Sequence, residues 1–189
     1  MKVTNTYKGF QFDEQKYKEL ILYIAERTLN DSGFGATKMA KTLLKADFVS
    51  FALYGKPITG AKYQKIEHGP AAVQYLPILN KMIQKKEVAQ AQKTIGGYSS
   101  TQIVALKKAN ISVFTKEEIA LIDNIILEFS NLNTHGVKKI VYDNLGIKYA
   151  GYKDEIPYLT ELIPSESIPL SEKEMEWAIS SDNYTEIEA

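Results

Sequence analysis

The stretch from Thr37 to Ala72 constrains the fold more than any other part of this sequence. Residues Thr37–Tyr54 place apolar side chains at helical spacing, which predicts an amphipathic helix. Asp47 stands in the middle of that apolar stripe, four residues after Leu43 and four before Phe51. A buried carboxylate is costly unless it is paired or hydrogen-bonded. We therefore expect nearby donors to hold Asp47.

Glycine and proline divide the segment that follows this helix. Gly55 is placed to end the helix with a positive φ angle. Pro57–Thr59 and Ala61–Glu67 predict two short strands around Gly60. We expect backbone N–H groups or a tyrosine hydroxyl of this hairpin to bind Asp47, in the Tyr54–Gly55 or the His68–Gly69 turn.

The predicted hairpin ends at His68 and Gly69, and Pro70 suits the first position of the next helix. That helix extends to about Lys86, and Pro77 inside it predicts a kink or an interruption.

The remaining pattern is mostly helical. Helices are predicted at Asp13–Leu29, after a capping box at Thr115–Glu118, at Thr134–Leu145 and at Ser171–Ser181, and a second hairpin is predicted from Glu87–Ile95 and Thr101–Leu106. We expect a mainly α (α+β) fold, a single compact helical domain with two small β-hairpins and an acidic C-terminal extension.

Composition excludes several classes of function. The chain has 189 residues and no cysteine, so it offers neither a disulfide nor a thiolate zinc site. No apolar run is long enough to cross a bilayer, and no secretory signal is visible at the N-terminus. We expect a cytoplasmic protein that has no membrane partner.

Charge is unevenly distributed although the net charge is zero. Residues 36–108 hold 12 lysines against three acids, a net charge of +9, and residues 154–189 hold ten acids against one lysine, a net charge of −9. Three interpretations stay open: the acidic end folds back on the basic body, the two ends face different partners, or both are ordinary solvated surfaces.

Asp47 has a structural and a catalytic interpretation. It is favoured as a hydrogen-bonded structural acid, and the alternative is a general base that converges with Glu67 and His68 in an unrecognised hydrolase. No nucleophile motif, glycine-rich phosphate loop or metal-ligand spacing supports an enzyme, so we expect no catalytic residue, cofactor or metal.

Lysines collect on the predicted helix and hairpin. We expect Lys38, Lys41 and Lys45 to lie on the helix face opposite the apolar stripe, near Lys62 and Lys65 of the hairpin. Such a surface is typical of solvated lysines, of contact with an acidic protein or of nucleic-acid binding. Arg27 is the only arginine, which weakens the sequence-specific DNA alternative.

The acidic C-terminal end carries one further candidate. Met175 and Trp177 stand among glutamates, in a pattern typical of an amphipathic helix that docks on its own domain or on a basic partner.

The order Tyr54-Gly55-x-Pro57-Ile58-Thr59-Gly60, followed by Tyr63 and by Gly69-Pro70, resembles the core of the Panacea domain, the SocA-type antitoxin family of bacteria and phages. Weaker similarity covers Phe114–Phe129 and Ile156-Pro157-Tyr158. The chain departs from the family pattern near Val141-Tyr142, where the family usually has a Ser-His pair and then a Trp.

The resemblance implies a domain over residues 1–158, with a structural core at Asp47, Tyr54, Gly55, Pro57, Gly60, Tyr63, Gly69 and Pro70, and an acidic extension over 159–189 with a short helix. It also implies a protein-binding module, not an enzyme. The expected partner is a toxin encoded by an adjacent gene, neutralised by direct contact or by delivery to a cytoplasmic protease. A DNA-binding regulator and a phage protein that counters host defence remain alternatives.

Overall fold

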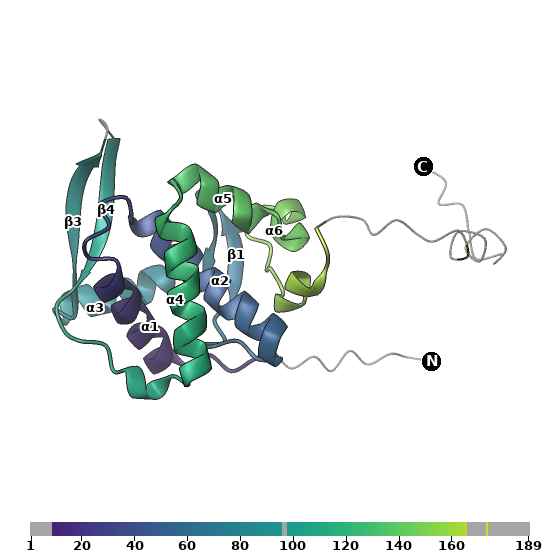
Figure 1. Ribbon diagram of the computed structural model, residues 1–189, viewed down its shortest axis with the longest axis horizontal. Helices are drawn as coiled ribbons and strands as arrows, with labels where there is room; N and C mark the ends of the chain where they lie inside the picture. Colours follow the sequence, from purple (N-terminus) through teal and green to yellow (C-terminus); the bar gives the residue numbers. More distant parts are fainter. Residues whose placement is uncertain (1–8, 96–97, 166–172, 174–189) are drawn as a thin grey trace.

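Helix α2 (Ala36–Tyr54) runs through the middle of the molecule and packs against both hairpins and three other helices (Figure 1). The computed structural model describes residues 9–95, 98–165 and 173. The predicted helix over 37–54 is confirmed. It ends at Gly55, whose φ angle of 72° confirms the predicted left-handed cap.

Two capped helices flank α2. Helix α1 (Glu14–Arg27) begins after Asp13, whose Oδ1 accepts a hydrogen bond from the Lys16 backbone N–H at 2.8 Å. Helix α4 (Lys116–Ser130) begins with the predicted capping box, because Thr115 and Glu118 each accept the other's backbone N–H. Both predicted helices are therefore confirmed.

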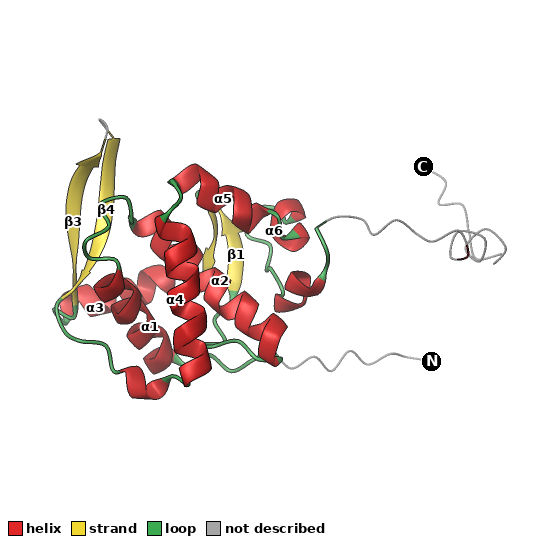
Figure 2. Cartoon of the chain, in the orientation of Figure 1, coloured by secondary structure: helices red, strands yellow, loops and turns green. Residues whose placement is uncertain are grey.

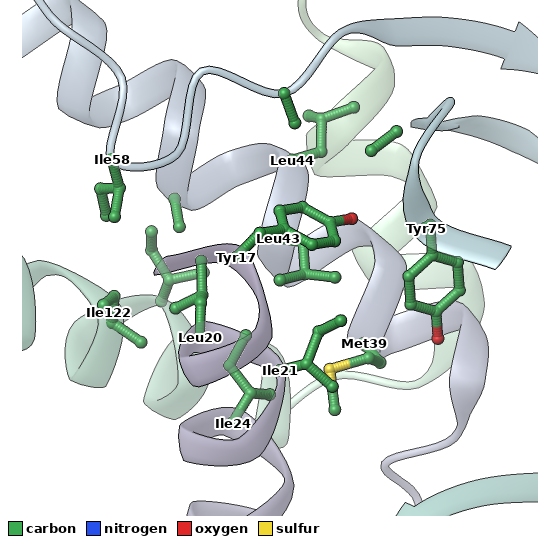
Figure 3. Packing of buried hydrophobic residues seen from close by; sticks show 14 of the residues in the cluster. Tyr17, Leu20, Ile21, Ile24, Met39, Leu43, Leu44, Ile58, Tyr75 and Ile122 are labelled. Carbon is green, nitrogen blue, oxygen red and sulfur yellow. The ribbon is translucent and has the colours of Figure 1, made fainter. Parts of the chain in front are cut away.

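The apolar core lies where these three helices meet (Figure 3). Side chains no more than 2% exposed come from α1 (Tyr17, Leu20, Ile21 and Ile24), α2 (Met39 and Leu43) and α4 (Ile122). Burial of this apolar surface is the main force that holds the helices together.

The first hairpin differs from the prediction. It pairs β1 (Tyr63–Ile66) with β2 (Gly69–Ala72), so Glu67 and His68 form its turn and do not end it. The predicted strand over 57–59 is wrong. Contacts with distant segments are the cause: the Thr59 N–H binds Asp47 and the Thr59 carbonyl accepts from the Asp13 N–H, so neither backbone group joins a ladder.

Helix α3 (Tyr75–Gln84) starts later than predicted. Pro70 lies in β2, so the expected helix start at Pro70 is wrong. Pro77 causes no interruption, because it occupies the first turn of α3, where backbone N–H groups have no partner within the helix.

The second predicted hairpin is present, but its second strand begins at Tyr98 and not at the predicted Thr101. Strand β3 (Val88–Ile95) pairs with β4 (Tyr98–Ala105), with Val88 opposite Ala105. Figure 2 shows this two-stranded arm extending from one side of the helical body.

The predicted helix over 134–145 is divided in two. Helix α5 (Thr134–Tyr142) stops, and Asn144 caps a new helix, α6 (Leu145–Tyr149), by accepting the Ile147 N–H at 3.1 Å. Two 3-10 turns, η1 (Ile111–Val113) and η2 (Tyr158–Leu162), complete the described elements. The predicted helix at 171–181 lies outside the described residues, apart from position 173.

The chain returns to the first hairpin near residue 155. Glu155 bridges Gln64, and the Ile156 N–H donates to the Tyr63 carbonyl at 2.9 Å. Tyr158 then joins an aromatic cluster with Phe10, Phe48, Phe51 and Tyr63. Across the described residues the protein is mainly α with two small antiparallel sheets, as predicted.

Candidate functional site

Asp47 is completely buried beneath the loop that precedes the first hairpin. Its Oδ1 accepts the Thr59 backbone N–H at 2.7 Å, and its Oδ2 accepts the hydroxyls of Thr59 at 2.5 Å and Tyr63 at 2.8 Å. Burial raises the pKa of Asp47 to about 6, while the Thr59 and Tyr63 hydrogen bonds oppose that rise. We call Asp47, Thr59 and Tyr63 the Asp47 cluster.

The cluster explains why this acid stands in an apolar stripe. The prediction of a tyrosine hydroxyl and a backbone N–H as donors is confirmed, but Thr59 and Tyr63 supply them and the two expected turns do not. Thr59 was missed because nothing in its sequence neighbourhood marks it as a partner of helix α2. The three bonds fix the helix to the loop and the hairpin.

The structure does not bring Asp47, Glu67 and His68 together. Tyr63, which binds Asp47, and the Glu67–His68 turn lie at opposite ends of strand β1, and both turn residues are exposed. The convergence on which the hydrolase alternative depended is therefore wrong. Within the described ranges, no group of three or more His, Asp or Glu side chains is placed to hold a metal ion.

The other predicted core positions divide into two groups. Pro57, Gly60, Gly69 and Pro70 are buried, and a Cβ atom on Gly60 would collide with the Gln11 carbonyl. Gly60 also has a φ angle of 69°, so glycine is required there twice over.

Tyr54 does not belong to the core. Its side chain is 47% exposed, and it is the last residue of α2. Gly55 is also exposed, and its role is confined to the helix cap.

The predicted lysine face is only partly present. Lys38 and Lys41 are each 2% exposed, so their expected place on a solvated face is wrong. The physical reason is that α2 is the central helix and is covered on several sides. Lys38 lies 3.9 Å from Asp31, and the Lys41 ammonium donates to the Pro70 carbonyl at 2.5 Å.

Of the other three predicted lysines, two serve intramolecular contacts. Lys45 forms an ion pair with Glu161 at 2.6 Å, and the Lys65 ammonium donates to the Lys148 carbonyl at 3.3 Å. Lys62 is exposed. The charge asymmetry is thus partly explained, because the first part of the acidic end folds back on the basic body.

A basic aromatic patch adjoins Lys65. Tyr149 and Tyr152 are 75% and 68% exposed, and the ammonium groups of Lys148 and Lys153 lie over their respective rings at 5.4 Å and 5.5 Å. Exposed tyrosines beside cations are typical of protein-binding surfaces. Sequence reasoning missed this patch, although the order Lys-Tyr-x-x-Tyr-Lys could have indicated it.

The family model for "Antitoxin SocA-like, Panacea domain" matches residues 39–145. This chain belongs to the SocA-like antitoxin family with a Panacea domain. The matched span contains Asp47, Thr59 and Tyr63, so the Asp47 cluster lies wholly inside the Panacea domain match. Neither the curated proteins nor the solved structures give a match to the chain.

The match leaves two parts of the described Panacea fold outside its bounds. Helix α1 precedes it, and the return segment with Tyr149, Tyr152 and Tyr158 follows it. Met175 and Trp177 lie outside the described residues, and their role in binding stays a prediction. No helix in the described part of the chain combines the length and apolarity that a membrane span requires.

Proposed function

We propose that this protein neutralises a protein toxin by binding it directly. The family match over residues 39–145 carries the proposal. The Asp47 cluster supports it, because a buried acid with three internal donors stiffens a scaffold and is closed to any substrate.

We place the toxin contact at the basic aromatic patch, defined by Tyr149, Tyr152, Lys148 and Lys153 with Lys65 beside it. Two large exposed rings supply apolar contact area at little entropic cost, and the cations suit an acidic partner. The acidic extension with Met175 and Trp177 is the proposed second contact, since it carries the opposite charge and a tryptophan.

The domain organisation forms part of this proposal. A domain over residues 1–158 followed by an extension from 159 is supported by the burial of Tyr158. Glu161 forms an ion pair with Lys45, so this first part of the extension lies against the domain. We also propose that this protein meets its toxin partner in the cytoplasm.

The test is co-expression with the product of the adjacent reading frame. We expect that product to be toxic alone, tolerated beside this chain and co-purified with it. Replacing both Tyr149 and Tyr152 with alanine should weaken the complex at least about tenfold, on the scale of two interface tyrosines. Tyr54→Ala is the matched control, since Tyr54 is also exposed but lies outside the patch.

Delivery to a protease is the alternative route to neutralisation. A stable equimolar complex that restores growth in cells lacking the cytoplasmic proteases would support direct contact. Neutralisation that disappears in those cells while the toxin accumulates would support delivery. A neighbouring product that is harmless alone and never co-purifies would refute both.

A further inference from the structure

A pocket of about 740 Å³ lies beside strand β4. Three segments that are far apart in the sequence line it: the loop that leads into α2, the first part of β4 and the turn between α4 and α5. Figure 1 shows these segments on the same side of the molecule. Sites for small molecules usually have volumes of about 300–1,000 Å³, so a ligand of that class fits the space.

The N-terminus of helix α2 lines this pocket. The first backbone N–H to bond within the helix is that of Met39, which donates to the Gly35 carbonyl at 3.0 Å. No side chain caps the helix, so the N–H groups of Ala36, Thr37 and Lys38 have no hydrogen-bond partner among the described residues. Because these donors stand at the positive end of a 19-residue helix, they favour an anion.

The Lys38 side chain is a second, independent donor in the pocket. Lys38 is 2% exposed and lines the pocket, and in the described structure its ammonium makes no hydrogen bond. The Asp31 Oδ2 is 3.9 Å from this ammonium, which is beyond hydrogen-bonding distance. Burial lowers the pKa of Lys38, and the charge of Asp31 opposes that effect. A buried ammonium with unused hydrogens is costly, and an oxyanion bound in the pocket would remove that cost.

Asp31 limits the kind of anion that fits. Its Oδ1 accepts the Gly33 N–H at 2.8 Å, whereas its buried Oδ2 has no hydrogen-bond donor within the described ranges. A phosphate placed directly against this carboxylate would be repelled. A hydroxyl group can donate to Asp31 and accept from Lys38, so it suits the gap between them. The pocket therefore favours a ligand that carries both an anionic group and a hydroxyl group.

Glycine at position 35 allows strand β4 to lie against the N-terminus of α2. A Cβ atom there would be 2.5 Å from the Ser100 Oγ and 3.3 Å from the Thr101 carbonyl oxygen. Ser130 and Thr134 bring further hydroxyl-bearing side chains to the lining from the turn between α4 and α5. Among the described residues that line the pocket there is no aromatic side chain, so a nucleobase would have no ring on which to stack.

We propose that this pocket binds a small phosphorylated sugar, with its phosphate on the N-terminus of α2 and on Lys38, and with a hydroxyl group between Lys38 and Asp31. Inorganic phosphate would leave the Asp31 oxygen without a donor, and a sugar without phosphate would leave the helix N–H groups unused. The ligand is a small molecule, so the inference goes beyond the proposed function and does not depend on a toxin partner.

The test titrates the full-length, isotope-labelled chain with ribose 5-phosphate and follows the backbone N–H shifts by NMR. Ribose and inorganic phosphate, the two halves of this probe, are the matched controls. We expect saturable shifts at Ala36, Thr37 and Thr134, and ribose 5-phosphate should bind at least about tenfold more tightly than either half. No saturable shift with ribose 5-phosphate, or equally tight binding of inorganic phosphate, would overturn the inference.

Ala36→Pro tests the contribution of the helix N-terminus. Proline is favoured at the first position of a helix, and the preceding Gly35 already has an extended backbone with φ −92° and ψ −177°, so the variant is expected to fold. The change removes one unpaired N–H group and should weaken binding of ribose 5-phosphate severalfold. Lys116→Pro is the matched control, since Lys116 is the first residue of α4 and does not line the pocket.

Two further variants assign the side-chain contacts. Lys38→Met should weaken binding of ribose 5-phosphate at least about tenfold, and Lys62→Met is its control, since Lys62 is exposed and outside the pocket. Asp31→Asn keeps an acceptor for the Gly33 N–H and removes the repulsion of anions. Inorganic phosphate should therefore bind Asp31→Asn more tightly than the wild type, and the preference for ribose 5-phosphate should decrease.

Melting temperatures establish which variants are folded. If Lys38→Met does not fold, Ala36→Pro and Asp31→Asn decide the question. Unchanged binding of ribose 5-phosphate by folded Ala36→Pro would place the ligand elsewhere and overturn the inference. An unchanged preference for ribose 5-phosphate over inorganic phosphate in Asp31→Asn would also overturn it, because Asp31 would then not contact the sugar.

Discussion

The Lys45 ammonium lies 2.6 Å from Glu161 Oε1 and joins helix α2 to η2 across 116 residues of chain. Asn144 donates to the other carboxylate oxygen at 2.8 Å, so both oxygens of Glu161 are engaged. The contact holds the acidic side chain of Glu161 against helix α2.

Reversing one charge of this pair should release η2. Lys45→Glu or Glu161→Lys alone is expected to cost about 1–2 kcal/mol of stability, since a partly buried attraction becomes a repulsion. Hydrogen exchange of residues 158–162 should accelerate in each single variant and return towards the wild-type rate in the double swap. Unchanged exchange in both single variants would show that the pair does not hold η2.

Substitutions in the Asp47 cluster should cause a large loss of folding stability. Asp47→Ala leaves the Thr59 N–H unpaired and opens a cavity, which should cost about 3 kcal/mol in urea unfolding. Asp47→Asn keeps an acceptor for that N–H, so its loss should be smaller. If Asp47→Asn folded normally and abolished a measurable turnover of any compound, the structural interpretation would be wrong.

The contribution of Asp47 to stability should decrease as the pH rises from about 4 to about 6. The pKa of Asp47 is raised from 3.8 to about 6, mainly by burial, so the folded state binds more protons than the unfolded state across this interval. The tyrosines around Asp47, Tyr17 and Tyr63, have pKa values raised above 10 and remain protonated there. Across this range the urea midpoint of the wild type should fall relative to that of Asp47→Asn, which lacks the titrating carboxyl group.

Two glycines with similar left-handed φ angles should respond differently to alanine. Gly60→Ala adds a collision with the Gln11 carbonyl to the cost of the left-handed conformation, so we expect a loss of at least about 2 kcal/mol. Gly55→Ala meets no atom within 4 Å and should lose only about 1 kcal/mol. Similar thermal shifts for the two variants would contradict the close packing at Gly60.

Deleting the chain from Pro164 onward should abolish toxin capture and preserve the fold. The cut lies after η2, so the contacts of Tyr158 and Glu161 are retained while Met175 and Trp177 are lost. A pull-down measures the complex, and the melting temperature of the truncated chain is the control. Intact binding after deletion would exclude the acidic extension as a contact.

Helical spacing and end signals were enough to predict most of the fold. Helices α1, α2 and α4 follow from apolar periodicity, and the cap at Gly55 and the box at Thr115–Glu118 follow from local chemistry. The first hairpin was misplaced because its position depends on a hydrogen bond between residues that are far apart in the chain. The Asp47 carboxylate accepts a hydrogen bond from the Thr59 N–H, and no local sequence pattern predicts that bond.

The candidate sites were harder to predict for the same reason. Lysine is usually solvated, so Lys38 and Lys41 were expected on the surface, yet the central position of α2 buries both.

The aromatic contacts of Tyr158 limit where this domain can be cut in protein engineering. Its ring packs against Phe10, near the start of the described chain, and against Phe48 and Phe51 of helix α2. A fragment cut to residues 39–145 would lack two of these rings, and the apolar surface that they cover would be exposed to solvent. Chimeras between members of this family should therefore be joined outside Phe10 and Tyr158.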